Sequence, residues 1–469
     1  MTEEIKVENP TQEVNIDLMD FHKLRKSKND ETWTPYEIID DKIAEYIIHN
    51  IYMFVMNGKP YIYEEGVYIC DDDCNILRFY IKQMIIQDVI TINRINRVLN
   101  LILSDPQLKK SSYEVNRYPD SWINFENGMF DVVNWEMHDH SPKYLSINQI
   151  PHGFYHNVDM KYNQSVCKEF LESTIPDEYD REMLLEYIGY CLTKDTSLQK
   201  FLIITGIGGT GKSVIIRLIE KVVGRKNISS LSLQDLNKRF YPTNLFGKLL
   251  NSCADIPKTA MEETDTIKKI TGEDTILGEY KGGALFDFRS YAKLLFSANE
   301  IPVTLDEKTN AFFRRFLILR ISKRGKEIEN LEQKLESEVL ILLGEVVKAL
   351  GEVYKNKGIC EGSNSKQLVS ELYQKSDSVY HFLSEECDII SPGESNYDKW
   401  VIKRGILLEQ YSRFCYENDR TPLKRNSFYD NVEKKGIFNV KRCGEWYFKG
   451  IKFKDTHFED AVETPFKGS

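Results

Sequence analysis

Residues 201–213 read FLIITGIGGTGKS, and this stretch decides how the centre of the chain folds. Phe201 to Thr205 form an apolar run typical of a buried strand, and Gly206 to Ser213 fit the pattern G-x-x-x-x-G-K-[S/T]. The following residues, Val214 to Val222, have helical spacing. A glycine-rich turn between a strand and a helix lets backbone N–H groups surround a phosphate, and the helix N-terminus adds positive potential. The stretch therefore predicts a phosphate-binding loop rather than a chance glycine-rich turn.

The polar residues of this loop and of the next strand-like run have separate expected roles. Lys212 is expected to reach the β- and γ-phosphates of ATP, and the Ser213 hydroxyl is expected to bind Mg²⁺. Asp255 closes the apolar run 248–254 and is a candidate magnesium ligand, or else a turn or capping carboxylate. Ile256 stands where many ATPases carry a second acid, so the general base stays open. The residues expected to bind the nucleotide are Gly206, Gly208, Gly209, Thr210, Gly211, Lys212 and Ser213.

Two later segments add candidate catalytic residues. Asn299 ends a third apolar run, where its amide can orient an attacking water or contact the γ-phosphate, unless it is an ordinary loop residue. Arg314 and Arg315 directly precede the apolar run 316–321. The pair is either a solvated strand end or the source of an arginine finger that acts on an adjacent subunit.

The chain is long enough for several domains. At roughly 100–200 residues per domain, 469 residues correspond to two to four, and 12% aromatic residues favour a folded protein. Between 201 and 321, strand-like runs alternate with helical or polar segments, which is typical of an α/β sheet with crossovers. We expect a multidomain α/β protein with a mostly helical N-terminal region. The predicted divisions are an unassigned region 1–80, a module 81–195, an ATPase core 196–325, a helical lid and linker 326–385, and a winged-helix-like domain 386–469.

The last part of the chain is basic although the whole chain carries a net charge of −10. Residues 399–454 contain 14 Lys and Arg against 6 Asp and Glu. Helical spacing over 406–417 and 424–435, followed by a hairpin-like alternation over 440–448, predicts a winged helix that binds DNA phosphates, with a basic structural cap as the alternative. The residues expected to face DNA here are Arg425, Lys434, Lys435, Lys441 and Arg442.

Several features indicate a cytoplasmic protein. The longest apolar runs fall short of the roughly 18 residues that a membrane helix needs, and the first residues lack a basic leader and an apolar stretch. Nine cysteines at wide spacing favour reduced thiols. We expect no membrane partner and a cytoplasmic location, in the host cell if a phage or mobile element encodes the chain.

The ordered set of motifs resembles the ATPase core of superfamily 3 helicases, in the poxvirus and phage/plasmid primase-helicase branch. The segments that carry this resemblance, over roughly residues 80 to 450, are GIGGTGKS (206–213), KLLNSCADIP (248–257), TGEDTILGEYKG (271–282), AKLLFSANEIP (292–302) and AFFRRFLILRI (311–321), with INFENGMFDVVNWEMHDHSP (123–142) before them and SDSVYHFLSEECDI (376–389) after.

The resemblance implies a hexameric AAA+ motor that hydrolyses ATP with Mg²⁺ and pulls single-stranded DNA through a channel. In that family the acid matching Asp255 binds magnesium, the amide matching Asn299 is a sensor, and an arginine of the pair acts in trans. Of that pair we favour Arg315, with Arg314 as the alternative. Lys281 matches the basic tip of a hairpin that grips DNA in the channel, and a surface lysine is the alternative.

The sequence departs from the family pattern at two points, and three functions are compatible with it. The second motif has a single acid, and residues 1–80 show no cluster of metal-binding acids, so we do not expect primer synthesis. The leading function is an ATP-dependent replicative DNA helicase of a phage or mobile element. It would work with single-stranded and origin DNA and with other replication proteins. The alternatives are an initiator that uses ATP only to assemble on origin DNA, and a small-molecule kinase, which would not need the arginine pair and the basic tail.

Overall fold

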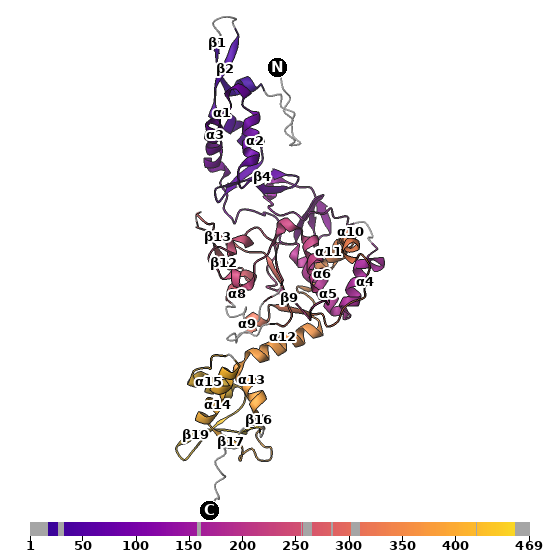
Figure 1. The fold of residues 1–469 in the computed structure, drawn as a ribbon, viewed down its shortest axis with the longest axis vertical. Coiled ribbons are helices and arrows are strands. Elements are labelled where there is room, and N and C mark those ends of the chain that lie inside the picture. The colour runs from indigo at the N-terminus through magenta and orange to yellow at the C-terminus, as the bar shows by residue number, and fades with distance from the viewer. Residues whose placement is uncertain are drawn as a thin grey trace, which may run out of the picture.

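The computed structural model describes residues 17–26, 32–156, 161–254, 256, 265–282, 285–301, 310–418 and 420–454. They form three parts that follow one another along an elongated molecule (Figure 1). The N-terminal part lies at one end, the largest sheet lies in the middle, and helix α12 (Ser363–Ser376) leads to the C-terminal part at the other end. The chain is therefore a mixed α/β multidomain protein.

The N-terminal part mixes helices with small antiparallel sheets, so it is less helical than expected. Its apolar cluster takes residues from Phe21 to Leu108. Helix α2 crosses the boundary predicted between residues 80 and 81, and it buries Leu77 and Ile81 in this one cluster. That boundary is therefore wrong. The elements are β1 (His22–Lys26), β2 (Trp33–Ile38), α1 (Asp40–Asn50), β3 (Met53–Met56), β4 (Lys59–Glu64), β5 (Val67–Cys70), α2 (Asn75–Gln83) and α3 (Ile92–Ser104).

A three-stranded antiparallel sheet joins this part to the centre. It consists of β6 (Trp122–Phe125), β7 (Gly128–Asp131) and β8 (Glu136–His138). Nearby, the buried Asn148 side chain donates to the Gly247 carbonyl at 2.9 Å and to Asn227 Oδ1 at 3.1 Å. Its own Oδ1 accepts from the Tyr291 hydroxyl at 2.7 Å. One side chain thus ties three central segments to the N-terminal side of the molecule.

The central sheet has five parallel strands in the order β10-β11-β14-β9-β15. Strands β9 (Phe201–Thr205) and β15 (Phe316–Arg320) match the apolar runs of the sequence closely, as do β11 (Leu250–Cys253) and β14 (Lys293–Ala298). The other elements are β10 (Ile228–Ser229), α4 (Val166–Thr174), α5 (Glu178–Cys191), α6 (Lys212–Val223), α7 (Leu233–Leu236), α8 (Asp265–Thr271), α9 (Asn310–Phe313), α10 (Leu331–Ser337), α11 (Val339–Asn356) and the antiparallel hairpin β12 (Thr275–Glu279) and β13 (Leu285–Arg289).

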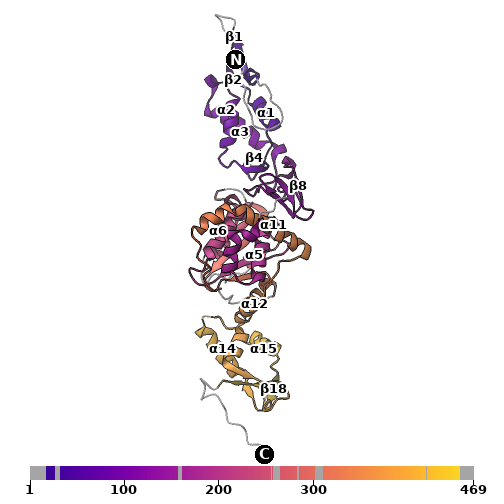
Figure 2. The same cartoon turned by 90° about the vertical axis from the view of Figure 1, so that its right-hand side faces the viewer.

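Both faces of this sheet are buried, which explains why its strands are mostly apolar. Leu202 and Ile204 point to one face and pack with α5, α6 and α11. Figure 2 shows these three helices together on the side turned toward the viewer. Phe201 and Ile203 point to the other face, in a cluster that includes Leu368 of α12. The alternation follows from the period of two in a strand.

Within the predicted helical lid, helices α10 and α11 are separated by a break at Glu338. The Glu338 carboxylate accepts from the backbone N–H groups of Val166 at 3.1 Å and Cys167 at 2.9 Å, at the start of α4. Helix α11 then packs against α5 within the central cluster. The predicted lid region 326–385 is therefore largely part of the core, because tertiary contacts bury its apolar stripe.

The C-terminal part has its own apolar cluster, which begins at Val379 in α13. Helix α13 lies before the boundary predicted at residue 386, so the division falls near Asp377 instead. The predicted helices and hairpin are present, with a third strand beside the hairpin in the order β17-β19-β18. The elements are α13 (Ser378–Glu386), β16 (Cys387–Ile389), β17 (Val401–Lys403), α14 (Arg404–Glu417), α15 (Arg425–Lys434), β18 (Asn439–Arg442), β19 (Glu445–Lys449) and β20 (Ile451–Phe453).

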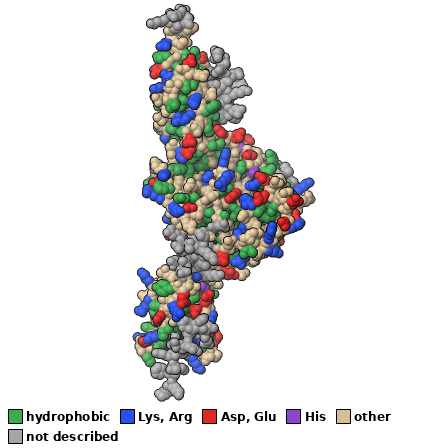
Figure 3. Space-filling model, in the orientation of Figure 1, with side chains coloured by type: hydrophobic (Ala, Val, Ile, Leu, Met, Phe, Trp, Pro, Cys, Tyr) green, Lys and Arg blue, Asp and Glu red, His purple; other side chains and the backbone are tan. Residues whose placement is uncertain are grey.

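Charged and apolar side chains are mixed over the face shown in Figure 3. Among the described residues, no helix combines the length and the apolar character needed to cross a bilayer.

Candidate functional site

The loop between β9 and α6 lies at the carboxyl edge of the central sheet. Strands β14 and β15 lie on the two sides of β9. After β9 the chain builds β10, β11 and β14 on one side, and it then passes over β9 to form β15 on the other. In open α/β sheets, ligands bind at such points of reversal, outside the carboxyl ends of the strands. The position of the loop therefore agrees with the phosphate-binding role predicted from its sequence.

Two glycines of the loop are required by its backbone. A Cβ atom on Gly206 would lie 2.2 Å from the Ile321 carbonyl oxygen. Gly211 precedes the first residue of α6 with φ of +107°, a conformation that side chains disfavour. Thr210 is buried and its hydroxyl donates to the Ile207 carbonyl at 2.9 Å, so this side chain shapes the loop.

Lys212 and Asn299, which are 87 residues apart in sequence, meet at this edge. The Lys212 ammonium donates to Asn299 Oδ1 at 3.1 Å, to the Ile207 carbonyl at 3.0 Å, and to the Gly206 carbonyl. These acceptors are all neutral oxygens, and Lys212 is only 8% exposed. A largely buried cation without a carboxylate partner among the described residues is suited to an anionic ligand.

A pocket of about 490 Å³ borders the start of the loop and Asn299. Small-molecule sites usually have volumes of about 300–1,000 Å³. The pocket has an apolar wall on helix α12, and its charged side chains are Arg320, Glu371 and Glu300. Its lining consists of Thr205, Gly206, Ile207, Asn299, Glu300, Ile301, Arg320, Ile321, Ser322, Leu368, Glu371 and Leu372.

The expected magnesium ligands can be followed only in part. Ser213 is exposed in the first turn of α6, and no contact occupies its hydroxyl among the described residues. Asp255 lies outside the described residues. Ile256 is buried and its N–H donates to the Ser297 carbonyl at 2.8 Å, so the position after Asp255 belongs to the apolar core. Ser213 has the hydroxyl oxygen that a hard cation prefers.

Of the two arginines, Arg314 is exposed and Arg315 is buried, the reverse of what a finger at Arg315 would require. Arg315 is 8% exposed, and its Nε donates to the Thr271 hydroxyl of α8 at 3.0 Å. Arg314 is exposed and donates to Gln199 Oε1 at 2.7 Å. The preference for Arg315 as the finger is therefore wrong on geometric grounds, because a buried side chain bonded to α8 cannot project from the surface. Arg314 is the remaining candidate.

Lys281 lies exposed in the turn of the β12–β13 hairpin. The body of the hairpin is fixed from outside: Arg239 forms two hydrogen bonds with the Glu279 carboxylate, at 2.7 and 3.0 Å. The ammonium of Lys59 in β4 lies 4.2 Å from the centre of the Tyr280 ring. Lys281 itself has no ion-pair partner within the described part of the chain. The sequence analysis missed Arg239 and Lys59, which carry no motif signal.

The basic residues of the C-terminal part fall into two groups. Lys435 pairs with Asp377 at 2.5 Å, and Arg442 donates to the Asp398 carbonyl at 3.2 Å. Arg425, Lys434 and Lys441 are exposed without an anionic partner among the described residues. The second group is therefore better suited than the first to bind phosphates.

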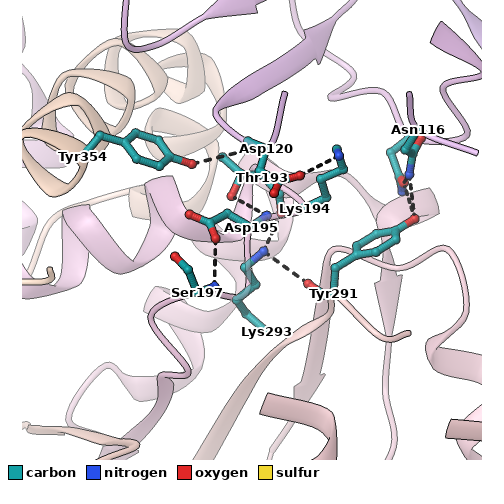
Figure 4. Close-up of polar contacts among 10 residues, drawn as sticks. Asn116, Asp120, Thr193, Lys194, Asp195, Ser197, Tyr291, Lys293 and Tyr354 are labelled. Carbon is teal, nitrogen blue, oxygen red and sulfur yellow. Dashed lines mark hydrogen bonds and ion pairs between the residues drawn. The ribbon is translucent and has the colours of Figure 1, made fainter. Parts of the chain in front are cut away.

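A buried lysine that the sequence analysis missed lies at the amino end of β14, the strand whose carboxyl end leads to Asn299 (Figure 4). The Lys293 ammonium donates to the carbonyls of Thr193 and, at 3.2 Å, Tyr291, and it lies 4.6 Å from the centre of the Tyr190 ring. Burial lowers the pKa of Lys293 to about 8. Lysine within an apolar strand pattern gave no signal, because its role depends on the loop that closes over it.

Comparison with known proteins gives four findings. A family model described as "D5 N terminal like" matches residues 40–176, and one described as "Family of unknown function (DUF5906)" matches residues 204–315. "Putative helicase L207/L206" of Acanthamoeba polyphaga mimivirus is 25% identical over 244 residues, which are 46% of this chain and 23% of that protein. The apo structure of the NrS-1 C-terminal region shares 13% identity at a TM-score of 0.51, over 88% of this chain and 99% of that one.

This chain thus spans less than a quarter of the length of its mimiviral relative. At 13% identity, the likeness to the NrS-1 structure is one of fold. Together the matches support a relationship to D5-like primase-helicases.

Proposed function

We propose that this chain is an ATP-dependent DNA helicase of the superfamily 3 type, with an AAA+ core that acts as a ring of identical subunits on single-stranded DNA. The observation that carries the proposal is the contact between Lys212 and Asn299 at the carboxyl edge of the sheet. A glycine loop, its lysine and an amide from the neighbouring strand form the arrangement that holds the β- and γ-phosphates of a nucleotide. The mimiviral relative, a protein described as a helicase, adds support.

Each residue has a role in this proposal. Lys212 would leave its neutral acceptors for the phosphates of ATP, and Asn299 would then face the γ-phosphate or the attacking water. Magnesium would be held by Ser213 together with Asp255, and it would neutralise charge on the phosphates. Arg314, from the surface, would act on the nucleotide of the neighbouring subunit. Lys281 would hold the DNA backbone from the hairpin tip.

The C-terminal part is proposed to bind DNA as a winged helix. Two helices followed by a hairpin, in a region of net positive charge, support this interpretation. The exposed cations Arg425, Lys434 and Lys441 are its proposed phosphate contacts.

The test is ATP hydrolysis by the full chain, with and without single-stranded DNA. We expect hydrolysis that DNA stimulates and that Lys212→Ala abolishes. Lys221→Ala is the matched control, because Lys221 belongs to the same helix but forms an exposed pair with Glu336 at 2.7 Å. Hydrolysis that survives Lys212→Ala would refute the assignment of the loop.

One observation favours a second function, an initiator that binds ATP in order to assemble on origin DNA. The residue after Asp255 is the buried Ile256, so the acid that activates water in many ATPases has no place there. ATP-dependent assembly on DNA without turnover would select this function over the helicase.

A further inference from the structure

Trp446 is an exposed aromatic residue beside the apolar cluster of the C-terminal part. It is 48% exposed on β19, directly opposite Lys441 of β18. It shares its strand face with the buried Phe448, because side chains two positions apart point to the same side. Phe448 lies in the cluster with α15, whereas Trp446 lies beyond the cluster, toward the hairpin turn at Gly444. A large flat ring is thus presented at the surface near the hairpin turn.

Two cations flank this ring. The Arg404 guanidinium lies 3.7 Å from the centre of the Tyr429 ring of α15 and 5.9 Å from that of Trp446. The Lys441 ammonium also lies 5.9 Å from the centre of the Trp446 ring. Aromatic rings attract cations at these distances, so the three side chains form one surface.

These two cations lack the anionic partners that their neighbours have. Lys403 forms an ion pair with Glu445, whereas Arg404 and Lys441 have no carboxylate partner within the described ranges. The Nε atom of Arg404 is buried and has no hydrogen-bond acceptor. The Arg404 side chain as a whole is half-buried, so its other guanidinium N–H groups can donate to a phosphate at the surface.

The chemistry of the surface identifies its ligand. An exposed indole offers a face to a planar ring, and adjacent cations offer contacts to phosphate, which is the combination found in single-strand binding sites. A base in a duplex is stacked on both sides and has no free face, so a duplex would use the cations alone. An unpaired nucleotide would use the whole surface.

We propose that Trp446, Arg404 and Lys441 form a site for single-stranded DNA, in which an unpaired base stacks on Trp446 and the two cations hold its flanking phosphates. The site deepens the proposed function, on which its choice of DNA rests. It gives the C-terminal part a contact with the single strand in addition to the phosphate contacts proposed for Arg425 and Lys434.

The test measures binding of the full chain, without nucleotide, to a fluorescent oligothymidylate and to a strand of the same length with abasic sugars. We expect Trp446→Ala to weaken binding of the oligothymidylate about 10-fold. Trp446→Phe should restore most of the affinity. On the abasic strand, which keeps the phosphates but offers no base, Trp446→Ala should change binding by less than about 2-fold.

The matched control is Tyr416→Ala. Tyr416 is 70% exposed on α14 and has no ring or cation contact among the described residues, so its loss should leave binding unchanged. Equal losses on the two strands would overturn the proposal, because Trp446 would then act through the fold rather than by stacking. An unchanged affinity of Trp446→Ala, or an equal loss on duplex DNA, would also overturn it.

The outcome is separable from that of the proposed function. Base-dependent binding through Trp446 in a chain that hydrolyses no ATP would sustain the site and refute the motor. DNA-stimulated hydrolysis together with normal DNA binding by Trp446→Ala would support the motor and refute the Trp446 site.

Discussion

Replacing Lys293 with Met should change how the stability of the protein depends on pH. The Lys293 ammonium is fully buried at the amino end of β14, where it contacts the carbonyls of Thr193 and Tyr291 (Figure 4). Burial lowers its pKa from 10.5 to about 8. The carboxylates of Asp195 and Asp120 oppose this effect, and neighbouring Lys194 adds to it.

The sign of the effect follows from proton linkage. Between pH 8 and 10.5 the unfolded chain keeps the Lys293 proton and the folded chain has released it, so folding becomes more favourable as the pH rises. The contribution of this pKa shift to the free energy of unfolding is fully present above pH 10.5 and is lost as the pH falls through about 8. From about pH 7.5 to about pH 10, the wild type should gain roughly 2 kcal/mol relative to Lys293→Met.

The assay is thermal unfolding of both proteins over this range of pH. The Tm difference between the wild type and Lys293→Met should grow in favour of the wild type as the pH rises. Lys293→Gln, which keeps hydrogen-bond donors without a charge, should follow the Met variant. Parallel curves for all three proteins would refute the reasoning, because Lys293 would then keep its proton in the folded state throughout.

Four other predictions concern the site and its support. Lys281→Ala should retain ATP hydrolysis without DNA but lose strand displacement, and unchanged unwinding would remove Lys281 from the DNA path. Arg314→Ala should lower hydrolysis by about 1,000-fold or more while nucleotide binding persists, and mixing with Lys212→Ala subunits should restore turnover. Arg315→Ala should instead lower the Tm, since it removes a buried hydrogen bond worth about 1–3 kcal/mol. Burial raises the pKa of the Glu186 carboxyl to about 7. From about pH 5 to about pH 8, the free energy of unfolding of the wild type should therefore fall by roughly 2 kcal/mol relative to that of Glu186→Gln. Measuring the unfolding of both proteins at each pH checks this.

Local patterns predicted the elements of the central site well. The apolar run of β9, the glycines after it and the helical spacing of α6 all depend on neighbours in sequence. The same holds for helices α14 and α15 and for the hairpin that follows them. Lys212 and Asn299 were each assigned a role in the same site from their motifs, and the pairing of β9 with β14 brings the two together.

Features that depend on distant contacts were beyond the sequence patterns. Whether Arg314 or Arg315 points inward is decided by Thr271 of α8, more than forty residues upstream. The break at Glu338 exists because its carboxylate caps a helix that begins at Val166. Neither the spacing of arginines nor the amphipathic pattern of a helix contains this information.

Helix α12 connects the pocket at the sheet edge directly to the C-terminal part. Its Ser365 hydroxyl accepts from the Ile318 N–H of β15 at 3.0 Å, and its Leu368 and Leu372 line the pocket. The 14 residues of α12 form a rod about 20 Å long that continues to Asp377, whose carboxylate caps α13. The arm from Leu368 at the pocket to Asp377 is about 14 Å long, so a tilt of about 10° at the pocket displaces Asp377 by about 2 Å. A ligand that shifts Leu368 and Leu372 in the pocket would therefore also shift the C-terminal part, including the Trp446 surface.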